Sequence, residues 1–184
     1  GGSMLVEYDS AAVDRIEIRS PGRDITLEKQ GGVWFMTSPL RYAADGLAVT
    51  SALANGRKIP VSSPVSTNPQ KQSLFQLDST GTLVKMSDRG TARAAFLVGK
   101  PGPSYTETYV RREGSDDVYL AAGLFGTFFT RPVDNWRDKT IFTADQSAMK
   151  ELTLTFGDTV IVLTRPDSVW RIGTEKLDEG VMKG

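Results

Sequence analysis

The chain has 184 residues, of which 39% are hydrophobic and 24% charged, and its 22 basic and 22 acidic side chains give a formal net charge of zero. This length and composition predict one globular domain with an annex, or two small domains. The sequence contains no histidine and no cysteine. A Ser-His-Asp triad, thiolate catalysis, disulfides and zinc–sulfur sites are therefore excluded. Zero net charge also gives no electrostatic reason to expect nucleic-acid binding.

The N-terminus carries two signals about the origin of the chain. Gly1-Gly2-Ser3 resembles a cloning remnant. No apolar run approaches the roughly 20 residues that span a bilayer. We interpret the start at Met4 as a cut, which leaves room for a membrane helix upstream of it in the natural protein.

Residues 13–37 predict three short strands. Ile16-Glu17-Ile18 alternates apolar and charged side chains, and Ile25-Thr26-Leu27-Glu28 alternates again. Turn residues at 20–22 and 31–32 separate these strands. Val33-Trp34-Phe35-Met36 forms the third strand. We expect an antiparallel meander with one apolar face.

A helix is predicted to follow this meander, from about residue 45 to residue 55. Asp45 is a suitable N-cap, and Asn55-Gly56 tolerates the left-handed conformation that ends many helices. Leu47, Ala48, Ala52 and Leu53 fall close to one stripe on a period of 3.6 residues. This stripe is expected to cover one face of the sheet.

The middle of the chain predicts a second antiparallel meander. Residues 57–80 read as an edge strand and a loop that Leu74, Phe75 and Leu77 hold against the core. Strand patterns follow at residues 82–86, 94–98, 107–112 and 117–120, with hairpin-type spacings between them. A short apolar segment at 121–129 is a candidate helix, and residues 143–147 are the candidate domain boundary.

The first three-strand unit recurs near the C-terminus. Shifting residues 13–37 by about 136 positions brings their apolar residues onto those of residues 149–173 without a gap. Trp34 falls on Trp170, and this matched placement favours a role for both in packing. Residues 177–181 then stand where a second covering helix would begin, so we interpret the second copy as truncated.

The predicted fold class is α+β, with antiparallel β-meanders, few helices and an internal β-β-β-α repeat. The predicted organisation is a cloning remnant at residues 1–3, a first unit with the second meander at 4–142, and the start of the second repeat at 143–184. The unfinished repeat is expected to expose apolar sheet surface. Such surface invites pairing, so chains could form a homo-oligomer through residues 149–172.

Tyr105, Tyr109, Arg111 and Tyr119 form the only interleaving of aromatic and cationic residues that suggests a binding face. Tyr109 and Arg111 share one face of a strand by the period of two. Tyr and Arg are enriched at binding hot spots, so this face suits a protein partner or a glycan. It equally suits an ordinary solvated sheet face. No catalytic residue, metal ligand or cofactor site is predicted.

The order of several short segments resembles a known family. These segments are Trp34 near a strand end, Ser38-Pro39-Leu40, Ala44-Asp45, Leu77-Asp78, Gly99-Lys100, Tyr109-Val110-Arg111, Val118-Tyr119-Leu120 and Trp136-Arg137-Asp138-Lys139. Their order and spacing resemble the bacterial domain-of-unknown-function family catalogued as 4340. The resemblance implies an N-terminal membrane helix, a repeat-containing part outside the cytoplasmic membrane, and association with ABC-type transport systems, including gliding-motility components. It implies no catalytic residues.

The expected function is therefore a non-catalytic, extracytoplasmic interaction or scaffold domain, anchored through a segment outside this sequence. Its expected partners are protein components of a membrane transport assembly. Two alternatives stay open: a module that binds a glycan or another cell-envelope ligand on the Tyr109 and Arg111 face, and a hydrolase that uses carboxylates alone. The hydrolase would need two carboxylates facing each other roughly 5–9.5 Å apart across a cleft.

Overall fold

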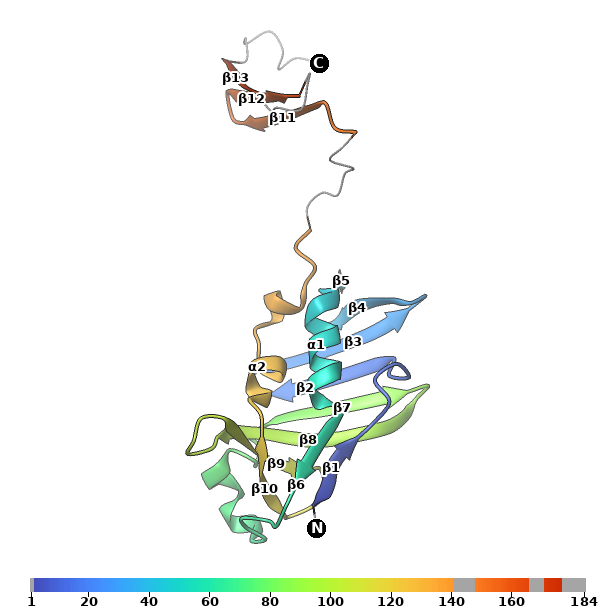
Figure 1. Ribbon diagram of the computed structural model, residues 1–184, viewed down its shortest axis with the longest axis vertical. Helices are drawn as coiled ribbons and strands as arrows, with labels where there is room; N and C mark the ends of the chain where they lie inside the picture. The colour runs from blue at the N-terminus through green and yellow to red at the C-terminus, as the bar shows by residue number, and fades with distance from the viewer. Residues whose placement is uncertain (1, 141–147, 166–170, 177–184) are drawn as a thin grey trace. The chain divides into compact units, whose positions relative to one another are not determined.

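The computed structural model describes residues 2–140, 148–165 and 171–176 of the chain (Figure 1). The chain separates into two compact units, Gly1–Lys139 and Thr140–Gly184, called unit 1 and unit 2. The boundary predicted at residues 143–147, the predicted packing residue Trp170 and the start of the predicted second helix at 177 lie outside the described residues.

The described part of unit 1 consists of ten strands, two α-helices and two 3₁₀-helices. The strands are β1 (Ser3–Glu7), β2 (Arg15–Ser20), β3 (Arg23–Gln30), β4 (Val33–Ser38), β5 (Tyr42–Ala43), β6 (Lys58–Val61), β7 (Thr82–Asp88), β8 (Thr91–Pro101), β9 (Glu107–Arg112) and β10 (Val118–Ala122). The helices are α1 (Gly46–Gly56), η1 (Pro69–Phe75), α2 (Phe125–Phe129) and η2 (Val133–Trp136). The chain is therefore mostly antiparallel sheet with few helices, as predicted.

Eight of these strands form one antiparallel sheet in the order β10-β9-β8-β7-β2-β3-β4-β5. The two predicted meanders are joined within it, because β2 pairs with β7 so that Ile16 lies opposite Met86 and Ile18 lies opposite Val84. Strands β1 and β6 form a separate two-stranded antiparallel sheet. The predicted edge strand in residues 57–80 is thus β6, with β1 as its partner.

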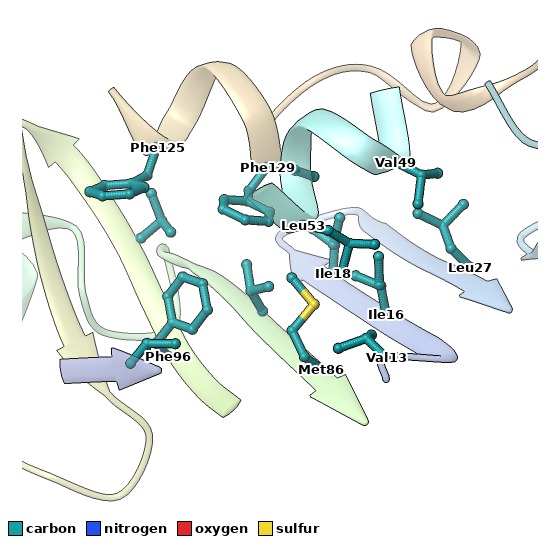
Figure 2. Close-up of a cluster of buried hydrophobic side chains, with 14 of the residues drawn as sticks. Val13, Ile16, Ile18, Leu27, Val49, Leu53, Met86, Phe96, Phe125 and Phe129 are labelled. Atoms are coloured by element: carbon teal, nitrogen blue, oxygen red, sulfur yellow. The ribbon is translucent and has the colours of Figure 1, made fainter. Parts of the chain in front are cut away.

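The main core lies between one face of the large sheet and the two α-helices. Within β2, β3 and β4 the alternation of side chains places five residues on this face, each at most 1% exposed: Ile16, Ile18, Ile25, Leu27 and Met36. Figure 2 shows Val49 and Leu53 pointing from α1 toward these strands. Trp34 is partly buried against the same core, in line with its predicted packing role.

Helix α1 begins where the sequence predicts. Oδ1 of Asp45 accepts hydrogen bonds from the backbone N–H groups of Leu47 and Ala48, at 3.0 and 3.2 Å. The predicted stripe is wrong at Leu47, which is 81% exposed, whereas Val49 is fully buried. The buried side of the helix consists of residues 48, 49, 52, 53 and 56. Steps of three and four residues that start at 49 stay on this side, whereas those that start at 47 do not.

Gly56 shows how closely α1 approaches its neighbours. A Cβ at this position would lie 2.8 Å from the Tyr8 hydroxyl oxygen and 3.0 Å from Cζ of Phe129. The Tyr8 hydroxyl donates a hydrogen bond to the Leu53 carbonyl oxygen at 3.0 Å, and its burial raises the pKa of Tyr8. The glycine therefore permits the contact of α1 with α2 and with the segment after β1.

A second apolar cluster lies on the opposite face of the large sheet. Its buried members are Leu77, Leu97 and Val118, with Phe75 of η1 partly buried against them. The loop after β6 is therefore held to the sheet by Phe75 and Leu77, as predicted. Leu74 is 60% exposed, so its predicted role in this contact is wrong.

The described part of unit 2 is a three-stranded antiparallel sheet. Its strands are β11 (Glu151–Phe156), β12 (Thr159–Thr164) and β13 (Arg171–Lys176), in that order. Leu152 pairs with Leu163, Leu154 pairs with Ile161, and Leu163 pairs with Ile172. These apolar residues share one face, since directly opposite residues point to the same side of a sheet.

Across the described ranges, no helix combines the length and the apolar character that crossing a bilayer requires.

The structure predicts that the Asp45 cap supports the sheet-covering helix. Asp45→Ala removes the acceptor for two helix N–H groups, so the free energy of unfolding of unit 1 should fall by about 1 kcal/mol. Asp45→Asn keeps an acceptor and should lose much less. Urea denaturation followed by circular dichroism measures both. Equal losses from the two variants would contradict the capping role.

Candidate functional site

The four residues of the predicted binding face do not share one face in the structure. Tyr109 and Arg111 lie on one face of β9, and Arg111 is directly opposite Val118 of β10. Tyr119 pairs with Val110, whose side chain is buried in the main core on the other face. Tyr105 lies in the turn between β8 and β9, with a positive φ of 57° and 78% exposure.

The Arg111 guanidinium is used within unit 1. Its Nε and Nη2 atoms donate to the carbonyl oxygen of Leu77, at 3.1 and 2.7 Å, and Nη1 donates to the carbonyl oxygen of Ser115 at 2.8 Å. These bonds tie the loop after η1 and the β9–β10 turn to the sheet. A bound ligand would have to compete with all three.

Tyr109 is likewise engaged in packing. Its ring centroid lies 4.8 Å from that of Phe75, and the ring packs against the cluster of Leu77, Leu97 and Val118. The Lys100 ammonium lies 5.9 Å from the centre of the Tyr109 ring, at the limit of a cation–π contact. The Tyr109 and Arg111 face is therefore partly covered by η1.

A cavity of about 490 Å³ lies beside the end of β1, and its lining residues include Glu7, Asp9 and Asp88. The Glu7 carboxylate pairs with Nζ of Lys58 at 3.0 Å. Asp88 pairs with the guanidinium groups of Arg89 and Arg93, at 3.1 Å each. Hydrogen bonds from Arg89 and then Arg93 hold the pKa of Asp88 below its usual value, so this carboxylate stays ionised and is poorly suited to act as a general acid.

Another carboxylate with a lowered pKa is Asp78, next to buried Leu77. The Thr80 hydroxyl donates to its Oδ1 at 2.5 Å and the Thr80 backbone N–H donates at 3.1 Å, and these two bonds lower the pKa of Asp78. This is the geometry of an Asx turn. Within the residues that the structure describes, no group of three acidic side chains could hold a metal ion.

The described part of unit 2 exposes three large apolar side chains. The side chain of Ile172 is 74% exposed, that of Phe156 66% and that of Leu154 36%. All three lie on one face. Leu154 and Phe156 are two residues apart in β11 and therefore point to the same side. Leu154 pairs with Ile161 of β12, and Leu163, two residues further along β12, pairs with Ile172. The sequence predicts such a surface, and the structure locates it.

Comparison with models of protein families gives a match. Residues 34–182 match a family model described as "Domain of unknown function (DUF4340)". The chain belongs to this family. No curated protein and no solved structure matches the sequence significantly.

In this DUF4340 chain, motif segments far apart in the sequence contact each other. The Asp45 N–H donates a hydrogen bond to the Trp136 carbonyl oxygen at 2.8 Å. Ala44 forms a β-bridge with Arg137. The Asp138 N–H donates to the Ala43 carbonyl oxygen at 2.8 Å. Residues 136–138 therefore hold the start of α1 in place.

A second group of DUF4340 motif residues meets on the opposite face of the sheet. The Arg111 guanidinium donates a hydrogen bond to the Leu77 carbonyl oxygen. Gly99 lies against Leu77, and a Cβ at position 99 would collide with the Phe75 carbonyl oxygen. Both groups of segments thus make structural contacts within unit 1.

Arg111→Lys should destabilise unit 1, because an ammonium group cannot reproduce the forked hydrogen bonds to two carbonyl groups. We expect a loss of about 1–3 kcal/mol in the free energy of unfolding, measured by urea denaturation. Tyr105→Ala, at an exposed position on the same hairpin, should change it by less than about 0.5 kcal/mol. If Arg111→Lys were neutral, the structural assignment of Arg111 would fail.

The Asp88 ion pairs predict a dependence of stability on acid. The pKa of Asp88 is lower in the folded chain than in the unfolded chain, where it is near 3.8. The ionised Asp88 side chain therefore stabilises the fold above the unfolded-state pKa. This stabilisation is lost as the pH falls through the folded-state pKa. From about pH 5 to about pH 2, Asp88→Asn should lose stability less steeply than the unchanged chain. Asp24→Asn removes the same charge from an exposed position. An acid profile of Asp88→Asn that parallels the unchanged chain would contradict the prediction.

Proposed function

We propose that the protein is a non-catalytic interaction domain and that the apolar face of unit 2 is its binding surface. The observation that carries this proposal is the exposure of Leu154, Phe156 and Ile172 on one face of β11–β13. Soluble domains rarely leave contiguous apolar surface open unless it binds a partner. The opposite face carries Thr153 and Thr155 paired with Val162 and Val160, so it has smaller apolar side chains.

The family supplies the proposed setting. Members of DUF4340 are expected to be anchored by an N-terminal membrane helix and to work outside the cytoplasmic membrane. We propose the same for this chain, as an auxiliary part of an ABC-type transport assembly. Association with protein components of that assembly would cover the apolar face of unit 2.

We further propose that β2–β4 and β11–β13 are copies of one ancestral unit. The support is their common register. Ile16–Leu27, Ile18–Ile25 and Leu27–Met36 pair in unit 1, and the pairs 136 positions later are Leu152–Leu163, Leu154–Ile161 and Leu163–Ile172. Matched registers follow naturally from duplication, since a slip of one residue would turn the apolar side chains to the other face.

The geometry gives less support to the two alternatives. A glycan on the Tyr109 and Arg111 face would compete with the bonds of Arg111 to Leu77 and Ser115. A carboxylate-only hydrolase would need an acid that can be protonated, whereas Asp88 in the cavity beside β1 is held in its charged form by two arginines. The assembly function is therefore favoured.

Photo-crosslinking in the natural, membrane-bound protein tests this function. A photoreactive phenylalanine at Phe156 lies on the apolar face, and one at Thr155 lies on the opposite face of the same strand. We expect a discrete adduct from position 156 that mass spectrometry identifies as a transport component, and little adduct from 155. Equal labelling from both positions, or adducts with no transport component, would contradict the proposal.

A further inference from the structure

We infer that the apolar face of unit 2 is a docking site for an amphipathic helix with the apolar pattern of α1, supplied by a partner protein. This inference rests on the proposed interaction function and names the kind of structure that the face accepts. Its basis is a comparison within the chain, between the covered face of β2–β4 and the exposed face of β11–β13.

The two faces carry large aliphatic side chains at equivalent register positions. Each of the five buried residues of unit 1 has a large aliphatic residue 136 positions further along the chain. The equivalent pairs are Ile16 and Leu152, Ile18 and Leu154, Ile25 and Ile161, Leu27 and Leu163, and Met36 and Ile172. The three apolar cross-strand pairs given above are the same in both sheets. Equal register and similar side-chain volume give the two faces a similar surface shape.

Exposure separates the two faces. The five residues in unit 1 are at most 1% exposed. Of their counterparts in unit 2, Leu154 is 36% and Ile172 74% exposed, and the other three are partly buried. In unit 1 the cover is α1, whose Val49 and Leu53 point toward Ile18 and Leu27 (Figure 2). Unit 2 has no helix in its described residues. The described strands of unit 2 thus form a face built like one that takes a helix.

The composition of α1 indicates what such a helix requires. Its buried side consists of Ala48, Val49, Ala52, Leu53 and Gly56. Small residues at 48 and 52 let the helix axis lie close to the sheet, while Val49 and Leu53 fill the space between strands. A partner helix for unit 2 should therefore alternate small and branched apolar residues at steps of three and four.

The size of the face argues against a stable dimer of two such sheets. Three strands of six residues present a footprint of roughly 20 Å by 14 Å. Two of these faces in contact would bury on the order of 600 Å² in total, well below the roughly 1,200 Å² at the lower end of stable interfaces. The 11 residues of α1 span about 17 Å, which fits this footprint along its length. A single helix on a larger partner is the better match, and its contact with this face alone should be weak.

The probe for this inference is a capped peptide of residues 44–57, which carries the α1 sequence, titrated into the isotope-labelled chain and followed by NMR. We expect saturable shifts in β11–β13 below about 1 mM peptide. A peptide with Val49→Asp and Leu53→Asp should not bind. Ile172→Glu in the protein should weaken binding by at least about tenfold, and Thr155→Glu, on the opposite face, should leave it unchanged.

Both protein variants replace exposed residues, and the dispersion of the unit 2 resonances reports whether the sheet is still folded. If Ile172→Glu unfolds it, Phe156→Glu at the end of β11 takes its place. Absence of saturable binding by the α1 peptide would overturn the inference. Light scattering that shows a dimer abolished by Ile172→Glu would also overturn it, in favour of a second copy.

The two proposals fail in different ways. If the peptide does not bind but position 156 still crosslinks to a transport component, the interaction function holds and the helix does not. If the peptide binds but no transport component is crosslinked, the face accepts helices and the proposed assembly role is wrong.

Discussion

The burial of one apolar sheet face beneath α1 is the interaction on which unit 1 depends. Five side chains from β2, β3 and β4 are removed from water there, and complete burial of each is worth about 1.5–3 kcal/mol. Several features keep the helix in position: the Asp45 cap, the close approach at Gly56, and the pairing of residues 136–138 with 43–45. Each supports the same contact between helix and sheet.

The described strands of unit 2 present the same kind of face, and the described residues of unit 2 form no helix over it. The hydrophobic effect that stabilises unit 1 is therefore available in unit 2 for binding. This links the fold to the proposed function, because a sheet that resembles a helix-covered sheet is a natural receptor for a helix. The motif residues of the DUF4340 family fit this view. Those that make the described contacts hold α1 or the η1 loop to the large sheet, and so maintain the scaffold.

Local sequence patterns were sufficient for the parts of the fold that depend on neighbouring residues. The alternation around Ile16 and Ile18 predicts the first meander, and Asp45 correctly marks the start of α1. The pairing of β2 with β7 was not predicted, because the partner of an edge strand is decided by long-range packing that no local period records. The same is true of β1, which pairs with β6 across more than fifty residues.

The candidate site shows the same division. The period of two correctly puts Tyr109 and Arg111 on one face, but Tyr119 follows the register of β10 and points to the other. The hydrogen bonds of Arg111 to Leu77 and Ser115 could not be predicted from the sequence. They depend on where the loop after η1 and the β9–β10 turn meet the sheet. By contrast, the apolar face of unit 2 could be predicted, because β11 alternates and the offset of about 136 residues aligns the apolar residues of β12 and β13 with those of unit 1.

The central claim is that two sheets of like register differ in whether their apolar face is covered. Hydrogen exchange of the free chain, resolved to single amides, tests this most directly. The account predicts slow exchange in β2 and β3, and much faster exchange at the equivalent amides of β11 and β12. Equally slow exchange in both sheets would show that the face of unit 2 is already covered in the isolated chain, and would contradict the account.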